Sequence, residues 1–172
     1  MLKHPIALLL VSSLCAPAAC SRGDAPERAA EGDSTRAGAQ GDDAAVDHVR
    51  AGARALTQPE PSVEYVAAEM EGVIMARTKN QALMHYDGYR ATLTTPGNQV
   101  TRITFDLIEA KPTIEQLSSV FGEPREVRKG MLYEHVSAVT GSTVAILAEP
   151  VSMPADEGSL VRRIIIERTR RR

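Results

Sequence analysis

Two segments of the chain share one pattern, and this repetition constrains the fold more than any other feature of the sequence. Residues 62–70 (SVEYVAAEM) match residues 113–121 (TIEQLSSVF). In each segment a hydroxyl residue, Ser62 or Thr113, is placed to cap a first helical turn, and Gln116 completes a capping box with Thr113. Apolar residues follow at the spacing of one helix face: Val63, Val66 and Met70 in the first segment, and Ile114, Leu117 and Phe121 in the second. Each segment therefore predicts a short helix.

Strand patterns follow both predicted helices. In the first half they cover residues 81–86, 89–95 and 100–105, and the tight-turn pair Asp87-Gly88 joins the first two. In the second half they cover residues 131–136, 143–149 and 161–166. The sequence therefore predicts an α+β fold with two repeats, about residues 62–107 and 113–168, each a helix followed by a three-stranded antiparallel meander.

The predicted helices are expected to pack on one face of the sheet. A further helix is predicted ahead of Pro59, where Val46, Val49, Ala53 and Leu56 recur at helical spacing. The chain has no tryptophan and only two phenylalanines, so aliphatic residues must supply most of the core. Phe121 and Ile164 are predicted core residues, because each occupies an apolar position of a repeated element.

Besides the two phenylalanines, the chain has four tyrosines: Tyr65, Tyr86, Tyr89 and Tyr133. Tyrosine is enriched among residues that dominate binding energy, so these side chains are candidates for contacts on an exposed sheet face. Some must fill core instead, and we expect Tyr89 and Tyr133 to be partly buried. The candidate partner contacts are Tyr86, Tyr89 and Met153, the last because it lies in a long connection at residues 150–159.

The first twenty residues have the pattern of an export signal. Lys3 supplies a positive start, an apolar run follows at residues 6–14, and small residues precede Cys20. The end of this segment, Ala18-Ala19-Cys20, resembles the bacterial lipoprotein signal, in which the cysteine is acylated after cleavage. Pro17 stands where leucine is usual in that signal. Residues 1–19 are thus predicted to be a signal peptide and Cys20 a lipidation site; a plain secreted protein with an unpaired Cys20 is the alternative.

A spacer is predicted to follow the lipidation site. Residues 20–43 contain no large apolar residue and are rich in Gly, Ala, Asp, Glu and Arg, so they are expected to form a disordered linker to a globular part at residues 44–172. Ser21 stands where an aspartate would indicate retention in the inner membrane. The expected location is therefore the outer membrane, with a lipid anchor and the domain facing the periplasm.

A family resemblance rests on residues 113–124 (TIEQLSSVFGEP), the following Gly130 and Tyr133, and the run of strands. Together they resemble the repeat unit of β-lactamase-inhibitor-protein-like domains, an architecture shared by the small lipoprotein of the outer-membrane β-barrel assembly machinery. Phe121 replaces the usual leucine of that unit, and Leu132 replaces its usual tryptophan. The resemblance implies a non-catalytic protein-binding module that acts in envelope assembly or inhibition, with an envelope protein as its partner.

Catalytic motifs are hard to find in this sequence. It has no nucleophile elbow, no Ser-x-x-Lys pair, no His-Glu-x-x-His and no glycine-rich phosphate loop, so no enzymatic activity and no cofactor or metal is expected. The alternative is a cell-envelope hydrolase that uses His85, Asp87 and His135.

Acidic and basic residues nearly balance, which argues against nucleic acid as a partner. The arginines of residues 168–172 could contact anionic lipid headgroups, lipopolysaccharide or an acidic partner; the alternative is a solvated end.

Overall fold

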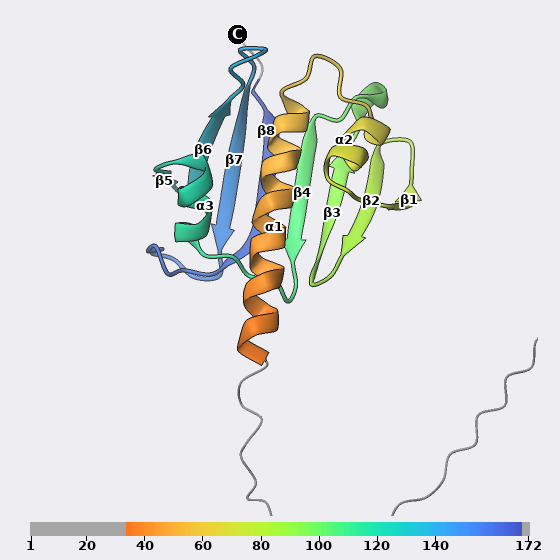
Figure 1. Ribbon diagram of the computed structural model, residues 1–172. Helices are drawn as coiled ribbons and strands as arrows, with labels where there is room; N and C mark the ends of the chain where they lie inside the picture. Colours follow the sequence, from red (N-terminus) through yellow and green to blue (C-terminus); the bar gives the residue numbers. More distant parts are fainter. Residues whose placement is uncertain (1–33, 170–172) are drawn as a thin grey trace, which may run out of the picture. The chain divides into compact units, whose positions relative to one another are not determined.

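Eight antiparallel strands form one open sheet, and three helices pack against it (Figure 1). The computed structural model describes residues 34–169; the predicted signal peptide, Cys20 and the last three arginines lie outside this range. The helices are α1 (Ser34–Leu56), α2 (Val63–Glu69) and α3 (Ile114–Phe121). The strands are β1 (Ile74–Arg77), β2 (Gln81–Tyr86), β3 (Tyr89–Thr94), β4 (Arg102–Leu107), β5 (Arg125–Val127), β6 (Gly130–Val136), β7 (Thr143–Pro150) and β8 (Val161–Arg168).

The strand order is β1-β2-β3-β4-β8-β7-β6-β5, so each half of the sheet holds four strands that are consecutive in the chain. Helix α2 precedes the meander β1–β4, helix α3 precedes the meander β5–β8, and the two meanders meet where β4 pairs with β8. Thr104 lies opposite Ile165 at the centre of this pairing. On one side Ile103 pairs with Ile166, and on the other Phe105 pairs with Ile164. Each of these two pairings therefore places a residue of one predicted strand, 100–105, opposite a residue of the other, 161–166.

The prediction of three strands per repeat was wrong, because each meander has four. The missing strands are β1 and β5, which lie at the two edges of the sheet. They are only four and three residues long, and neither contains a buried residue. Without a buried face, the residues show no alternation of apolar and polar side chains, which is the signal that identifies a half-buried strand.

The predicted helix ahead of Pro59 is present, but it begins earlier than expected. Helix α1 starts at Ser34, within the segment predicted to be a disordered linker, whereas the globular part was expected to start at Ala44. The Asp42 carboxylate accepts a hydrogen bond of 2.6 Å from the backbone N–H of Lys111, so this turn of the helix is fixed to the body of the protein. Gln116 donates a second bond, of 3.1 Å, to Asp43. The low apolar content that predicted disorder does not reveal these polar contacts.

Helix α1 runs along the sheet over the junction of β4 and β8 (Figure 1). Its predicted apolar face is confirmed, since Val46, Val49, Ala53 and Leu56 are all buried. Gly52 lets the helix approach the sheet closely: a Cβ atom at this position would lie 3.0 Å from the Ile103 side chain. In the part of the chain that the structure describes, no helix is long and apolar enough to cross a membrane.

The ends of the two short helices agree with the sequence patterns. Ser62 caps α2 by accepting from the Tyr65 N–H, and Thr113 caps α3 within a complete capping box formed with Gln116. Of the two predicted core residues, Ile164 is fully buried, but Phe121 is only half-buried. Phe121 lies in the last turn of α3, where it packs at the margin of the core against Tyr133 and His135.

Candidate binding face

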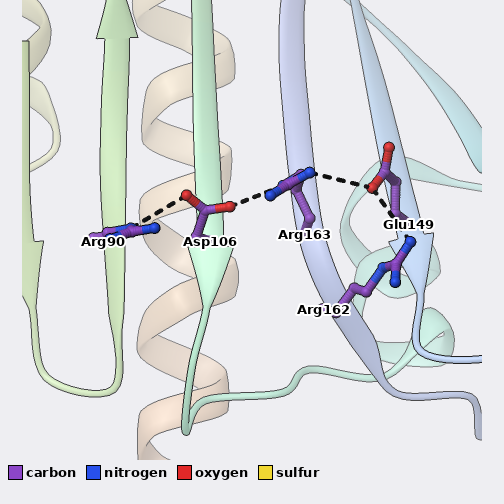
Figure 2. Close-up of polar contacts among 5 residues, drawn as sticks. All are labelled: Arg90, Asp106, Glu149, Arg162 and Arg163. Carbon is purple, nitrogen blue, oxygen red and sulfur yellow. Dashed lines mark hydrogen bonds and ion pairs between the residues drawn. The ribbon is translucent and has the colours of Figure 1, made fainter.

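The sheet has one covered face and one open face. Side chains alternate along the strands between the two edges: one set, such as Ile103 and Phe105, is buried under the helices, and the other is half-buried or exposed. Figure 2 shows charged side chains on the open face, with helix α1 behind the strands. An antiparallel sheet covered on one side only leaves its other face available to solvent or to a partner.

A continuous row of uncharged side chains crosses the open face. Successive strand pairings place six half-buried residues side by side in the order Leu83, Thr92, Thr104, Ile165, Leu147 and Leu132. We call these six residues the open-face row. The row runs from β2 to β6 and therefore extends over both meanders. Its four aliphatic side chains and two threonine methyl groups form an apolar stripe that no described element covers.

A network of alternating charges borders this row on one side (Figure 2). Asp106 accepts from Arg90 at 3.2 Å and from Arg163 at 2.8 Å. Arg163 also lies 3.8 Å from Glu149, which lies 3.9 Å from Arg162. The hydrogen bond and charge of Asp106 raise the pKa of Arg163. Because the arginines are about half exposed, each pair adds little stability, but together they order the side chains along this border.

The other border of the row is also charged. Arg102 and Glu167 pair across β4 and β8 at 2.9 Å, and both side chains are exposed. The apolar row is therefore flanked by charged residues on both sides. An apolar centre with a polar rim is the usual composition of a protein–protein interface.

Two predicted contact residues, Tyr86 and Tyr89, lie on the covered face of the sheet instead. Tyr89 is buried, with 3% of its surface exposed, so it cannot serve as a partner contact. Tyr89 and Tyr133 were expected to be partly buried, and the structure buries both almost completely. The ring of Tyr86 stacks on that of Tyr89, with centroids 4.9 Å apart, and its hydroxyl donates to the Met70 carbonyl. The prediction placed these tyrosines on the wrong face because the sequence does not show which face of the sheet α1 and α2 cover.

His48 of α1 completes this aromatic cluster. Its Nδ1 atom shares a hydrogen bond with the hydroxyl group of Tyr89, and its ring lies 4.5 Å from that of Tyr86. Burial lowers the pKa of His48, although the carboxylates of Glu71 and Asp47 act in the opposite direction. Burial also raises the pKa of Tyr86 to about 12 and raises that of Tyr89. All three groups are therefore neutral near pH 7 and pack as a half-buried polar–aromatic contact between helix and sheet.

This cluster makes the free energy of unfolding dependent on pH. Since the pKa of folded His48 lies below the ordinary value of 6.5, the unfolded chain binds a proton more readily. The contribution of the neutral ring is complete above pH 6.5 and is lost as the pH falls from there through the lowered pKa. We expect urea unfolding to show lower stability at pH 5.5 than at pH 7.5, with a smaller difference in His48→Gln.

His135 adds to the same acid sensitivity, because burial and the charge of Arg54 lower its pKa as well. The His48→Gln variant should therefore keep part of the pH dependence, and a His48→Gln/His135→Gln double variant should keep less. An unchanged difference between the two pH values in the double variant would contradict this assignment.

The three residues of the hydrolase alternative are not brought together. His85 is exposed on the open face of β2, and Asp87 lies in the turn that follows. His135 lies on β6, on the covered face, beside Phe121. Four strands separate β2 from β6, which corresponds to about 24 Å at the usual strand spacing. These side chains cannot act on one substrate, and residues 34–169 contain no group of acidic, histidine or cysteine side chains placed to hold a metal ion.

The connection at residues 150–159 has an exposed part and an anchored part. Met153 is 45% exposed, as expected for a candidate contact residue. Further along, the Ser159 and Glu157 carbonyls accept from the first N–H groups of α3, on Ile114 and Glu115. Deletion of the whole connection would therefore disturb α3, and only the part around Met153 is free to change without affecting the helix.

Comparisons of the chain with known proteins do not identify a family. No family model, no curated protein and no solved structure matches the chain. The candidate site is therefore defined by its geometry alone. Sequence reasoning indicated that one sheet face would be free, but it missed the open-face row and its charged borders, because these depend on the register between strands distant in sequence.

Proposed function

We propose that the protein is a lipid-anchored lipoprotein of the outer membrane, facing the periplasm, that binds an envelope protein without catalysis. The domain is an α+β unit in which two related helix-and-meander repeats form one sheet, in the manner of β-lactamase-inhibitor-protein-like domains. The role is assembly or inhibition of the bound protein. The lipid site is Cys20, and the partner contacts lie on the open face of the sheet.

The observation that carries this proposal is the open-face row. A partly exposed row of Leu, Ile and Thr side chains that reaches across six strands is unusual for a surface exposed only to water. Its charged borders add electrostatic specificity, since a partner must match the order of charges as well as the shape. His135 lies far from His85 and Asp87. This separation favours a binding module over a hydrolase that uses these three residues.

Disruption of the open-face row is expected to abolish partner capture. Leu132 and Leu147 are paired neighbours in the row, so the double change Leu132→Gln/Leu147→Gln replaces its apolar end with polar side chains of similar size. We expect at least about a tenfold loss of crosslinked partner from envelopes that contain the full-length protein, as for residues that dominate the binding energy of an interface. The measurement is quantitative mass spectrometry of the captured protein.

Val139→Gln is the matched control, because Val139 is 93% exposed in the connection between β6 and β7 and does not belong to the sheet face. Both proteins should retain the circular dichroism spectrum of the unmodified domain. Equal capture by the double variant and the control would refute the open face as the binding surface.

A further inference from the structure

A basic hollow lies at one end of the sheet, beside the second meander. It has a volume of about 440 Å³ and is lined by Arg128, Lys129, Glu149, Arg162 and the residues 150–153. Three segments meet there: the turn between β5 and β6, the end of β7 and the start of β8. The network of alternating charges on the open face ends at this hollow, since Glu149 and Arg162 belong to both (Figure 2).

Positive charge is in excess in the hollow. Its single carboxylate, Glu149, is largely buried, with 13% of the side chain exposed, and is already shared between Arg162 and Arg163. Arg128 and Lys129 are exposed, and neither side chain forms an ion pair or hydrogen bond with another described residue. Two cations that are consecutive in the chain therefore line the hollow without a compensating charge among the described residues. An anionic group placed between them would gain charge-assisted hydrogen bonds.

The hollow also has apolar lining residues. Val151 is 55% exposed and Met153 is 45% exposed. A hydrogen bond of 2.8 Å from the Val151 N–H to the Leu160 carbonyl fixes the start of the connection. The hollow thus combines cationic and apolar lining residues. Its ligand must carry negative charge and an apolar group close together.

We propose that this hollow binds an acidic segment of a protein partner, with a carboxylate between Arg128 and Lys129 and an apolar side chain against Val151 and Met153. The inference rests on the proposed function and identifies the chemistry of the partner. A concave site of about 440 Å³ lies within the size range of pockets that bind small groups. A membrane surface, in contrast, is bound by flat basic patches with many more cations, so a peptide fits the hollow better than a lipid headgroup layer.

The test uses the full-length protein with two labelled probes. The first is a fluorescein-labelled octapeptide of alternating glutamate and leucine, and the second is its analogue of alternating lysine and leucine. Fluorescence anisotropy should show binding of the acidic peptide only, with an affinity that decreases as salt is added. The Arg128→Gln/Lys129→Gln variant should lose at least about tenfold in affinity, or 1.4 kcal/mol.

Lys79→Gln provides the matched control. Lys79 is an exposed cation in the turn between β1 and β2, which corresponds in the first meander to the turn that holds Arg128 and Lys129. This variant should bind the acidic peptide like the unmodified protein. Equal loss in both variants, or no binding of the acidic peptide, would overturn the proposal. Binding to vesicles of phosphatidylglycerol and phosphatidylcholine, but not to the peptide, would overturn it in favour of an anionic lipid.

Capture from envelopes separates this proposal from the function on which it rests. Loss of capture in Leu132→Gln/Leu147→Gln with normal capture in Arg128→Gln/Lys129→Gln would refute the hollow while leaving the open face as the binding surface. Absence of any captured protein, even with the unmodified chain, would refute the proposed function itself.

Discussion

Replacement of Ile164 by alanine is expected to lower the free energy of unfolding by about 2–5 kcal/mol, the range typical of large-to-small changes in a core. Ile164 is fully buried at the junction of the two meanders, where it pairs with Phe105 on one side and Ala148 on the other. A cavity at this position would weaken both pairings. A small domain has little more stability than this to lose, so the midpoint of urea unfolding should fall sharply.

The next residue along β8 supplies the control. Ile165 has the same side chain but points to the open face and is half-buried. Ile165→Ala should therefore lower the midpoint much less than Ile164→Ala. A similar effect of the two changes would show that the covered face of β8 has been assigned wrongly.

Gly130→Ala should be almost as disruptive, for a different physical reason. Gly130 begins β6 with a φ angle of +154°, and a Cβ atom there would lie 2.1 Å from the carbonyl oxygen of Ala148. The obstacle is backbone of the neighbouring strand β7, so no side chain can move to make room. We expect a loss of about 3 kcal/mol or more, measured by urea unfolding, because the clash adds to the backbone strain.

Gly158→Ala is the control that shows whether the loss of stability is specific to position 130. Gly158 lies in the connection between β7 and β8, and the nearest atom to an added Cβ would be a carboxylate oxygen of Asp156 at 3.8 Å. This change should leave the unfolding midpoint nearly unaltered. If Gly130→Ala also had no effect, β6 and β7 could not be paired as described.

Local patterns in the sequence were enough to predict most of the secondary structure. The caps at Ser62 and Thr113 and the hairpin at Asp87-Gly88 depend on residues close together in the chain, and all are present. The edge strands β1 and β5 were missed because they bury nothing. The early start of α1 was missed because the polar residues Asp42 and Asp43 are fixed by hydrogen bonds from Lys111 and Gln116, which are far away in sequence.

The candidate site was harder to predict than the fold. Within one strand, alternation predicts that every second residue lies on the same face of the sheet. It does not predict that Thr104 and Ile165 lie side by side, because that depends on the pairing of β4 with β8. The same holds for Asp106, whose two arginine partners come from different meanders. Tyr86 and Tyr89 were placed on the exposed face because the sequence does not reveal which side α1 covers.

The pairing of β4 with β8 has a consequence for how the two halves depend on each other. With Thr104 opposite Ile165 at its centre, the junction has the geometry of an isologous dimer interface, in which each half presents the same surface to the other. Here both halves belong to one chain and share the helix α1 that packs over their junction. Neither half can therefore be expressed alone as a shorter binding module, since cutting between them would expose two long edge strands and leave one helix without half of its contacts.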